Sequence, residues 1–287
     1  MRDQPAGATP WWTWPTILSL DAPVVAMLWQ GLLARLSGVP LGWAPVVVLG
    51  LSVWLSYVLD RWLEAWRLDP ADVRTARHAF HQRARWPLAA AWAVVFAIDL
   101  VLAFAWLDAR MLIAGALLLP PVLAYLLSHQ LVHRDHPWRV PKEICIAALL
   151  GGGVVVFPAA VPDPPLGALV APLAGFVLVA LANCILISTW ERGVDLSQGQ
   201  TSLALQHPAG ARFGRRLAWG LAVGGGLTAV ALRAPTGVAA GCAAASAALL
   251  LVIDRLEART GPEPARVLAD AALMTPLAIL AAGWTIR

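Results

Sequence analysis

Charged side chains are scarce in this sequence of 287 residues. Asp, Glu, Lys and Arg together make up 13 % of it and hydrophobic residues make up 59 %, whereas soluble domains contain about 25 % charged residues. The short segments of alternating polarity that mark membrane β-strands are also missing. The composition therefore excludes an ordinary soluble domain and indicates a polytopic α-helical membrane protein.

Cysteine and histidine are also rare. The three cysteines lie singly, without the paired spacing of a metal site, so we interpret them as small core residues and expect no disulfide framework. They are Cys145, Cys184 and Cys242. The six histidines include two clusters with helical spacing, which are His78 and His81, and His129, His133 and His136. Membrane di-iron enzymes need more histidines than this, so interfacial histidines are the favoured interpretation.

Apolar stretches of about 20 residues, the length that crosses a bilayer as a helix, recur along the chain. We expect nine spanning helices, near residues 17–36, 41–59, 87–107, 111–129, 144–162, 166–189, 217–233, 235–253 and 267–285. Only Arg233 and Pro235 separate the seventh from the eighth. The sequence thus predicts an all-α bundle of about nine transmembrane helices in two pseudo-repeated halves.

We expect a single transmembrane domain over residues 1–287, with a cytoplasmic amino-terminal segment (1–16) and two cytoplasmic loops (60–86 and 190–216). Helix breakers also lie inside the predicted spans. Pro120 and Pro121 predict a kink or a break. The glycine triplets 151–153 and 224–226 predict close approach of neighbouring helices.

Basic residues are distributed unevenly over the predicted loops. Of the 21 Lys and Arg, all but Arg35, Arg110, Arg233 and Arg287 fall on the side of the membrane that carries the amino terminus. The positive-inside rule makes that side cytoplasmic. We therefore expect an integral protein of a bacterial inner membrane, and the basic charge does not imply a nucleic-acid partner.

Two acidic pairs with the same spacing follow two of the predicted spans, the second and the sixth. Asp60 and Glu64 form the first pair, and Glu191 and Asp195 form the second. A spacing of four residues places both acids of a pair on one helical face. Carboxylates at the end of an apolar bundle are costly unless a cation or a partner compensates them. The pairs are therefore candidates for a functional site.

Basic side chains lie close to both pairs, and the combination is typical of a diphosphate site. Mg²⁺ binds through one or two carboxylates together with substrate phosphates. Arginine holds phosphate oxygens bidentately, and a metal assists the departure of a diphosphate group. The alternative interpretation is that acids and arginines merely solvate the ends of the helices at the membrane interface.

The sequence around both pairs resembles the Asp-rich motifs of the UbiA superfamily of intramembrane prenyltransferases, whose nine-helix bundle carries them after the second and sixth helices. The first motif, N-D-x-x-D-x-x-x-D, falls on Ser56, Tyr57, Asp60 and Glu64. The second motif, D-x-x-D-x-x-x-D, falls on Ser188, Glu191 and Asp195. Ser56, Tyr57 and Ser188 thus replace an Asn and two Asp of the family, and each motif keeps two acids, one of which is Glu.

Two further segments carry the resemblance. Residues 201–204, Thr-Ser-Leu-Ala, resemble the family's T-L stretch after its second motif. Residues 141–143, Pro-Lys-Glu, resemble the loop in which a basic group of the family contacts diphosphate. The similarity in helix number and motif placement covers nearly the whole chain.

The resemblance implies a prenyltransferase that moves an isoprenoid chain from an allylic diphosphate to a hydrophobic or aromatic acceptor within the membrane. It implies Mg²⁺, if the chain is active, bound by the catalytic acids Asp60, Glu64, Glu191 and Asp195. The residues implied at the diphosphate are Arg61, Arg77, Arg134, Lys142, Ser56 and Ser188. The implied partners are the isoprenoid diphosphate, the lipophilic acceptor and membrane lipids.

Two alternatives stay open. The replaced motif residues are compatible with a non-catalytic relative on the same helical scaffold. Acidic residues within or near the spans, Asp21, Asp99 and Asp270, are also compatible with a proton or ion pathway, and hence with a transporter.

Overall fold

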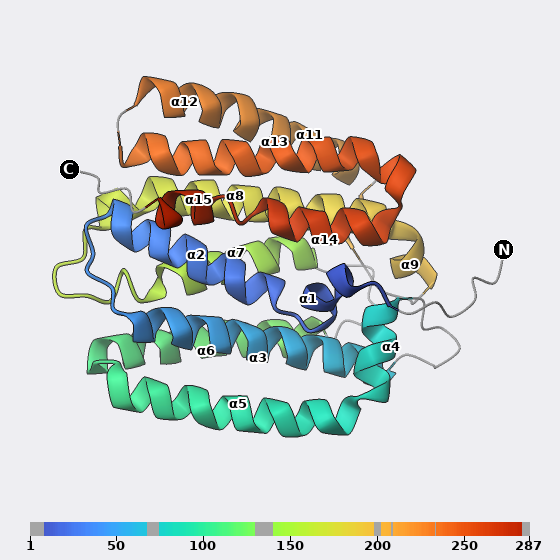
Figure 1. Cartoon of the computed structure of the whole chain (residues 1–287), viewed down its shortest axis with the longest axis horizontal. Coiled ribbons are helices and arrows are strands. Elements are labelled where there is room, and N and C mark those ends of the chain that lie inside the picture. The colour runs from blue at the N-terminus through green and yellow to red at the C-terminus, as the bar shows by residue number, and fades with distance from the viewer. Residues whose placement is uncertain are drawn as a thin grey trace.

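The computed structural model describes residues 9–67, 75–129, 140–197, 202–207, 209–232 and 234–282. Every regular element within these ranges is a helix, and the longer helices lie side by side along one axis of the molecule (Figure 1). The amino-terminal half of the chain contains η1 (Trp11–Thr13), α1 (Trp14–Ile17), α2 (Asp21–Leu36), α3 (Trp43–Arg67), α4 (Ala76–Arg83), α5 (Arg85–Trp106) and α6 (Ala109–Leu127). The remainder contains α7 (Lys142–Val156), α8 (Leu166–Trp190), α9 (Arg192–Ser197), α10 (Leu203–Gln206), α11 (Gly210–Gly220), η4 (Leu221–Gly225), α12 (Gly226–Ala231), α13 (Thr236–Thr260), α14 (Pro262–Ala272) and α15 (Pro276–Ala281).

Burial separates the central helices from the outer ones. In the apolar stretches of α8 and α13, 44 % and 56 % of the residues are buried, whereas in α5 and α6 only 11 % and 6 % are. The side chains of α5 that point outwards are large and apolar, including Val101 and Phe104. So large an apolar surface on a soluble protein would cause association. The hydrocarbon core of a membrane covers such an apolar surface, so the chain is an integral membrane protein.

The described residues contain six helices that are long and apolar enough to cross a membrane, namely α3, α5, α6, α8, α13 and the segment Pro262–Ala281. A seventh is counted if the segments Trp11–Ile17 and Asp21–Leu36, which meet at an angle of 73°, form one broken span. Helical segments coincide with all nine predicted positions. However, α7 has 15 residues, and at 1.5 Å per residue it covers only about 22 Å of a hydrocarbon core of about 30 Å.

Exposed tryptophans lie at both ends of the bundle. The rings of Trp43 and Trp106 are 5.2 Å apart at one end, and Trp66 and Trp86 are exposed at the other, together with Trp11 from the cluster that precedes the first span. Tryptophan is enriched where a membrane protein meets the headgroup layer. The two groups are therefore consistent with two membrane interfaces separated by the length of the long helices.

Helix α3 extends further than expected, because the sequence predicted its end near residue 59 and the structure continues it to Arg67. The first acidic pair therefore lies in the last turns of the helix and not in a loop after it. Most of residues 60–67, namely the two Arg, Leu, Glu and Ala, are good helix formers. The indole of Trp62 also donates a hydrogen bond to the carbonyl of Arg85, which ties this extension to α5.

A kink or a break was predicted at Pro120 and Pro121, and the structure shows no break, since α6 continues through both residues. A proline removes one intrahelical hydrogen bond, but spanning helices accommodate it by local adjustment. The break in the last span lies instead just before Pro276, between α14 and α15. There the indole of Trp29 donates a 2.8 Å hydrogen bond to the carbonyl of Leu273.

The glycine triplet 151–153 does permit close approach, as predicted. A Cβ atom added at Gly151 would lie 2.4 Å from the Cγ2 atom of Val177, so the missing side chain is what lets α7 pack directly on α8. Valine has a stiff χ1 angle and cannot easily turn away. Gly167, in the first turn of α8, has open space around its Cβ position.

We expect Gly151→Ala to lower the free energy of unfolding by about 1–3 kcal/mol through overpacking against Val177. Helix propensity favours Ala by about 1 kcal/mol and offsets only part of this loss. Gly167→Ala is the matched control and should leave stability unchanged or slightly raised. Thermal unfolding of the detergent-solubilised protein measures both. Equal melting temperatures for the two variants would contradict the proposed contact.

Candidate functional site

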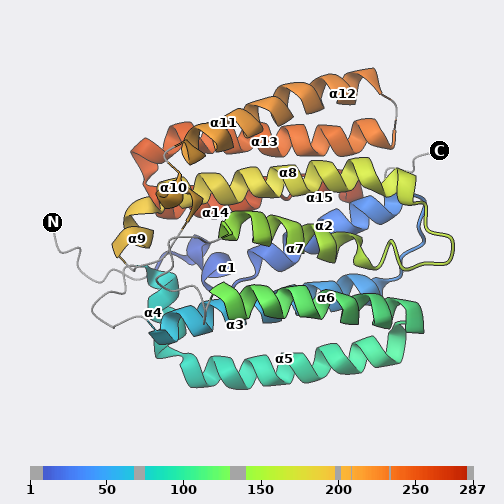
Figure 2. The same cartoon turned by 180° about the vertical axis from the view of Figure 1, so that it is seen from behind.

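The two acidic pairs lie at the same end of the bundle although they are 131 residues apart in sequence. Helices α3 and α8 both end there, next to α4 and α9 (Figures 1 and 2). Asp60 and Glu64 occupy the last turns of α3, Glu191 directly follows α8, and Asp195 lies in α9. The fold thus places the residues of both predicted motifs at one end of the bundle.

The short helix α4 contacts both pairs through two neighbouring residues. The imidazole of His78 lies 3.1 Å from the carboxylate of Glu64, and the guanidinium of Arg77 lies 3.9 Å from that of Glu191. Thr75 caps α4 and orients the same imidazole through a 2.9 Å hydrogen bond to Nδ1. Burial lowers the pKa of His78, so at neutral pH a neutral ring links Thr75 to Glu64.

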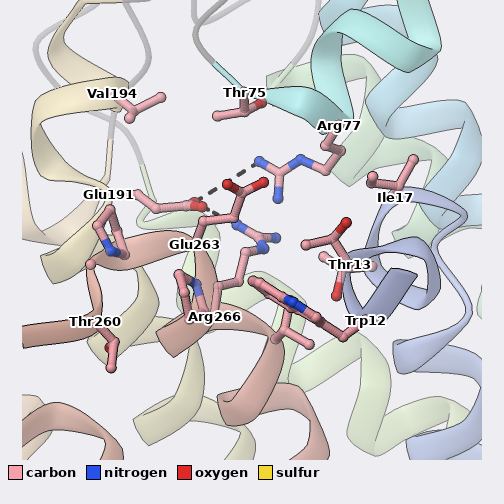
Figure 3. A pocket seen from close by; sticks show the side chains of 15 residues that line it. Trp12, Thr13, Ile17, Thr75, Arg77, Glu191, Val194, Thr260, Glu263 and Arg266 are labelled. Atoms are coloured by element: carbon pink, nitrogen blue, oxygen red, sulfur yellow. Dashed lines mark hydrogen bonds and ion pairs between the residues drawn. The ribbon is translucent and has the colours of Figure 1, made fainter. Parts of the chain in front are cut away.

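Glu191 is held between two arginines from different helices. Figure 3 shows the carboxylate of Glu191 between the guanidinium groups of Arg77 and Arg266. Arg266, in the first turns of α14, donates a hydrogen bond of 2.5 Å to this carboxylate. Burial alone would raise the pKa of Glu191, but Arg266 and Arg77 lower it to about 2. Burial and the repulsion of Arg266 lower the pKa of Arg77 to about 10. All three groups are therefore charged at neutral pH.

A second set of contacts holds α9 and α10 against α7. The ammonium group of Lys142 lies 3.7 Å from Asp195, and the buried carboxylate of Glu143 accepts a hydrogen bond from the backbone N–H of Leu203. Lys142 also interacts electrostatically with Glu64 and Glu191. The two acidic motifs and the start of α7 therefore form one charged cluster.

A pocket of about 420 Å³ opens beside the arginine pair. Its wall combines the charged groups of Arg77, Glu191 and Arg266 with side chains from η1, α1 and the junction of α13 and α14 (Figure 3). The residues from these last segments include Trp12, Thr13, Thr16, Ile17, Pro262 and Val267. The charged part of this wall suits a polar group such as diphosphate.

The structure places the other predicted site residues in different surroundings. Arg61 is buried and donates a hydrogen bond to the carbonyl of Thr16, with its guanidinium 5.8 Å from the ring centre of Tyr57. The hydroxyls of Ser56 and Ser188 donate to carbonyls of their own helices, those of Ser52 and Ile185. Arg134 lies outside the described residues.

Two site residues were not identified from the sequence. Arg266 was counted only as a basic loop residue, and Glu143 was given no partner. One feature of the sequence could have pointed to Arg266: it lies four residues before Asp270 at the start of an apolar helix. Charged residues in such a position need partners within the bundle. The identity of that partner, Glu191, depends on how α14 packs on α8.

The family that the two motifs resemble implies Mg²⁺, and the residues present fit this ion only together with a phosphate ligand. The described residues contain no group of three or more His, Cys, Asp or Glu side chains able to hold a metal. However, the charged cluster offers several carboxylates beside its cations, because Glu64, Glu143, Glu191 and Asp195 meet Arg77, Lys142 and Arg266. Oδ2 of Asp195 is buried without a hydrogen-bond partner among the described residues. This oxygen fits a cation whose remaining ligands are phosphate oxygens.

The described histidines form no metal site of their own. The two in the first cluster bond to protein groups, since His78 contacts Glu64 and His81 contacts the carbonyl of Arg77. His133 and His136 lie outside the described residues. The first cluster was interpreted as interfacial histidines, whereas the structure buries both rings against protein groups.

No protein-family model and no curated protein sequence matches the chain. Among solved structures, the apo structure of a UbiA homolog from Aeropyrum pernix K1 is similar, with a TM-score of 0.63 and 18 % sequence identity. The match covers 92 % of this chain and 99 % of that chain. The chain therefore shares the fold of that UbiA homolog over nearly its whole length, in agreement with the resemblance of the motifs.

We expect Glu191→Gln to destabilise the protein, because it leaves two largely buried guanidinium groups without their counter-charge. Breaking a buried ion pair costs roughly 3–5 kcal/mol. Glu263→Gln is the matched control, since Glu263 lines the same pocket but is exposed. A large drop in the melting temperature of Glu191→Gln alone is the expected result, and equal drops would contradict the assignment.

The acid sensitivity of this pair follows from the pKa of Glu191. The folded-state value of about 2 lies below the ordinary value of 4.5, so the ion pair stabilises the fold above about pH 4.5 and the stabilisation is lost as the pH falls towards 2. We expect the melting temperature of the wild type to fall over this range more steeply than that of Glu191→Gln. Parallel pH profiles would contradict the role of this carboxylate.

Proposed function

We propose that this protein is a UbiA-like prenyltransferase that moves an isoprenoid chain from an allylic diphosphate to a hydrophobic or aromatic acceptor within the membrane. One observation carries the proposal. In the fold of a UbiA homolog, the adjacent residues Arg77 and His78 of α4 contact one acid of each motif, Glu191 and Glu64.

The charged cluster offers complementary groups for a diphosphate. Arg77, Lys142 and Arg266 supply positive charge where the leaving group accumulates negative charge, and bidentate arginine contacts fix its orientation. Asp60, Glu64, Glu191 and Asp195 are the proposed ligands of Mg²⁺. When bound, the metal would add positive charge at the diphosphate oxygens. Arg61 and Arg134 remain proposed contacts of the same group.

The remainder of the substrate is apolar and requires an apolar surface. The pocket lies at the end of a bundle whose outer helices α5 and α6 face lipid, so an isoprenoid tail can lie among the spans and enter from the bilayer. We propose that the end carrying the motifs faces the cytoplasm of a bacterial cell, in agreement with the excess of basic residues on that side.

A second candidate is a relative that binds an isoprenoid diphosphate without transferring the chain. Two features favour it: Ser56, Tyr57 and Ser188 replace polar and acidic motif residues, and Glu191 is already paired with Arg77 and Arg266. In this case the site would bind the isoprenoid diphosphate and leave the bond between the isoprenoid and the diphosphate intact. Binding without release distinguishes this candidate from the enzyme.

The test incubates purified protein with labelled allylic diphosphates of several chain lengths and extracted lipids, with and without Mg²⁺. We expect Mg²⁺-dependent release of diphosphate by the wild type, and a fall of at least about tenfold in Asp60→Asn and Asp195→Asn, as is typical when a metal site is damaged. Asp163→Asn, at an exposed position with φ of 51° that Asn also tolerates, is the control.

Three outcomes separate the hypotheses. Release that depends on the motif acids supports the transferase. Binding of the diphosphate without release supports the non-catalytic binder and contradicts the transferase. Neither binding nor release, with an ion flux in liposomes that depends on Asp99 or Asp270, would favour the transporter.

A further inference from the structure

A group of arginines at the edge of the bundle lies outside the charged cluster. They belong to α11 and to the last turns of α13 (254–260), which lie side by side at the same end as the acidic motifs (Figure 2). These two segments contain five arginines and two acids, so their net charge is +3. The residues are Arg212, Arg215, Arg216, Arg255 and Arg259, with Asp254 and Glu257.

The packing of α11 on α8 determines which side chains of α11 point away from the protein. A Cβ atom added at Gly214 would lie 2.6 Å from the Cγ2 atom of Ile185, so this face of α11 lies directly against α8. Successive residues of a helix are about 100° apart, which places Arg212, Arg216 and Trp219 on the opposite face. All three are exposed. The two arginines, four residues apart, are neighbours on that face.

Side-chain contacts join the charged ends of α11 and α13. Arg215 donates two hydrogen bonds, of 2.7 Å and 3.2 Å, to the carboxylate of Asp254. The indole of Trp190 donates a third hydrogen bond, of 3.0 Å, to the same carboxylate. The guanidinium of Arg255 lies 5.7 Å from the ring centre of Trp219, so this arginine of α13 reaches the outward face of α11.

The other arginines have no comparable counter-charge. Arg212, Arg216, Arg255 and Arg259 are all exposed, and we call these four residues the arginine patch. Within the part of the chain that the structure describes, none of the four forms an ion pair, and Arg215 takes the carboxylate of Asp254. The arginine patch therefore presents uncompensated positive charge at the motif end of the bundle.

The surface becomes apolar within one or two helical turns of the arginine patch. On α11 the exposed side chains of Trp219 and Val223 follow Arg216 at about 5 Å and about 10 Å along the axis. On α13 the exposed side chain of Val252 lies about 5 Å before Arg255. Positive charge followed by apolar surface is the order that matches the phosphate and the acyl chains of a phospholipid.

We propose that the arginine patch is a binding site for a phospholipid with a negatively charged headgroup. Arginine binds phosphate oxygens bidentately, and tryptophan is enriched at the level of the headgroups. The acyl chains would lie along Trp219 and Val223. A zwitterionic lipid fits less well, because its ammonium group adds positive charge beside the arginines. The proposal does not depend on the proposed function.

The test titrates the full-length protein in detergent with phosphatidylglycerol or with phosphatidylcholine of the same acyl chains. Native mass spectrometry gives the dissociation constant of the first bound lipid. We expect the wild type to bind phosphatidylglycerol more tightly than phosphatidylcholine. The dissociation constant for phosphatidylglycerol should rise about fivefold in Arg216→Gln and about 25-fold in the double variant Arg212→Gln/Arg216→Gln, given the usual contribution of a basic residue at an anionic membrane surface.

Arg110→Gln is the matched control, because it also removes one exposed arginine, at the opposite end of the bundle. Its dissociation constant should stay within about twofold of the wild-type value, since the phosphate binds about a full helix length away. The melting temperature without added lipid shows whether each variant is folded. If the α11 double variant does not fold, Arg255→Gln/Arg259→Gln on α13 should weaken binding in its place.

Three results would overturn the proposal. The first is equal affinity of the wild type for the two lipids. The second is unchanged affinity for phosphatidylglycerol in the folded double variants. The third is a dimer that binds no phosphatidylglycerol and dissociates in Arg212→Gln/Arg216→Gln, which would assign this face to a second copy of the chain. Loss of affinity in the patch variants alone supports the phospholipid site, whether or not the protein transfers a prenyl group.

Discussion

The ion pairs around Glu191 connect three parts of the chain that are far apart in sequence. Arg77 comes from α4, Arg266 from α14, and the carboxylate from the end of α8. Each of these charges would be expensive at an apolar bundle end on its own, and each is tolerated because the other two are present. The position of α4 over the site, and hence the link between the two acidic motifs, depends on this arrangement.

The positions of the long apolar helices were predictable, because the apolar runs have the length that a bilayer requires. The ends of the helices were less predictable. The sequence placed the end of α3 where the apolar run stops, but the helix continues because Glu64 contacts His78 and Trp62 contacts the carbonyl of Arg85. Such contacts are made in three dimensions and leave no periodic signal in the sequence.

The acidic residues of the site were predictable from their spacing, and their partners were not. Helical geometry fixes that Glu191 and Asp195 share a face, whereas the packing of α14 on α8 decides that Arg266 reaches Glu191. Asp270 illustrates the same limit. It reads as an isolated acid near the start of a span, and only the bundle brings its carboxyl group to Asn183.

The contacts of α4 also constrain how this chain can vary. Neighbouring residues of an α-helix point in directions about 100° apart, and Arg77 and His78 use that difference to reach two separate helices. Inserting or deleting one residue between them would rotate one side chain away from its partner, whereas many exchanges elsewhere on α4 would not. The length of this short helix is therefore more tightly restricted than its composition.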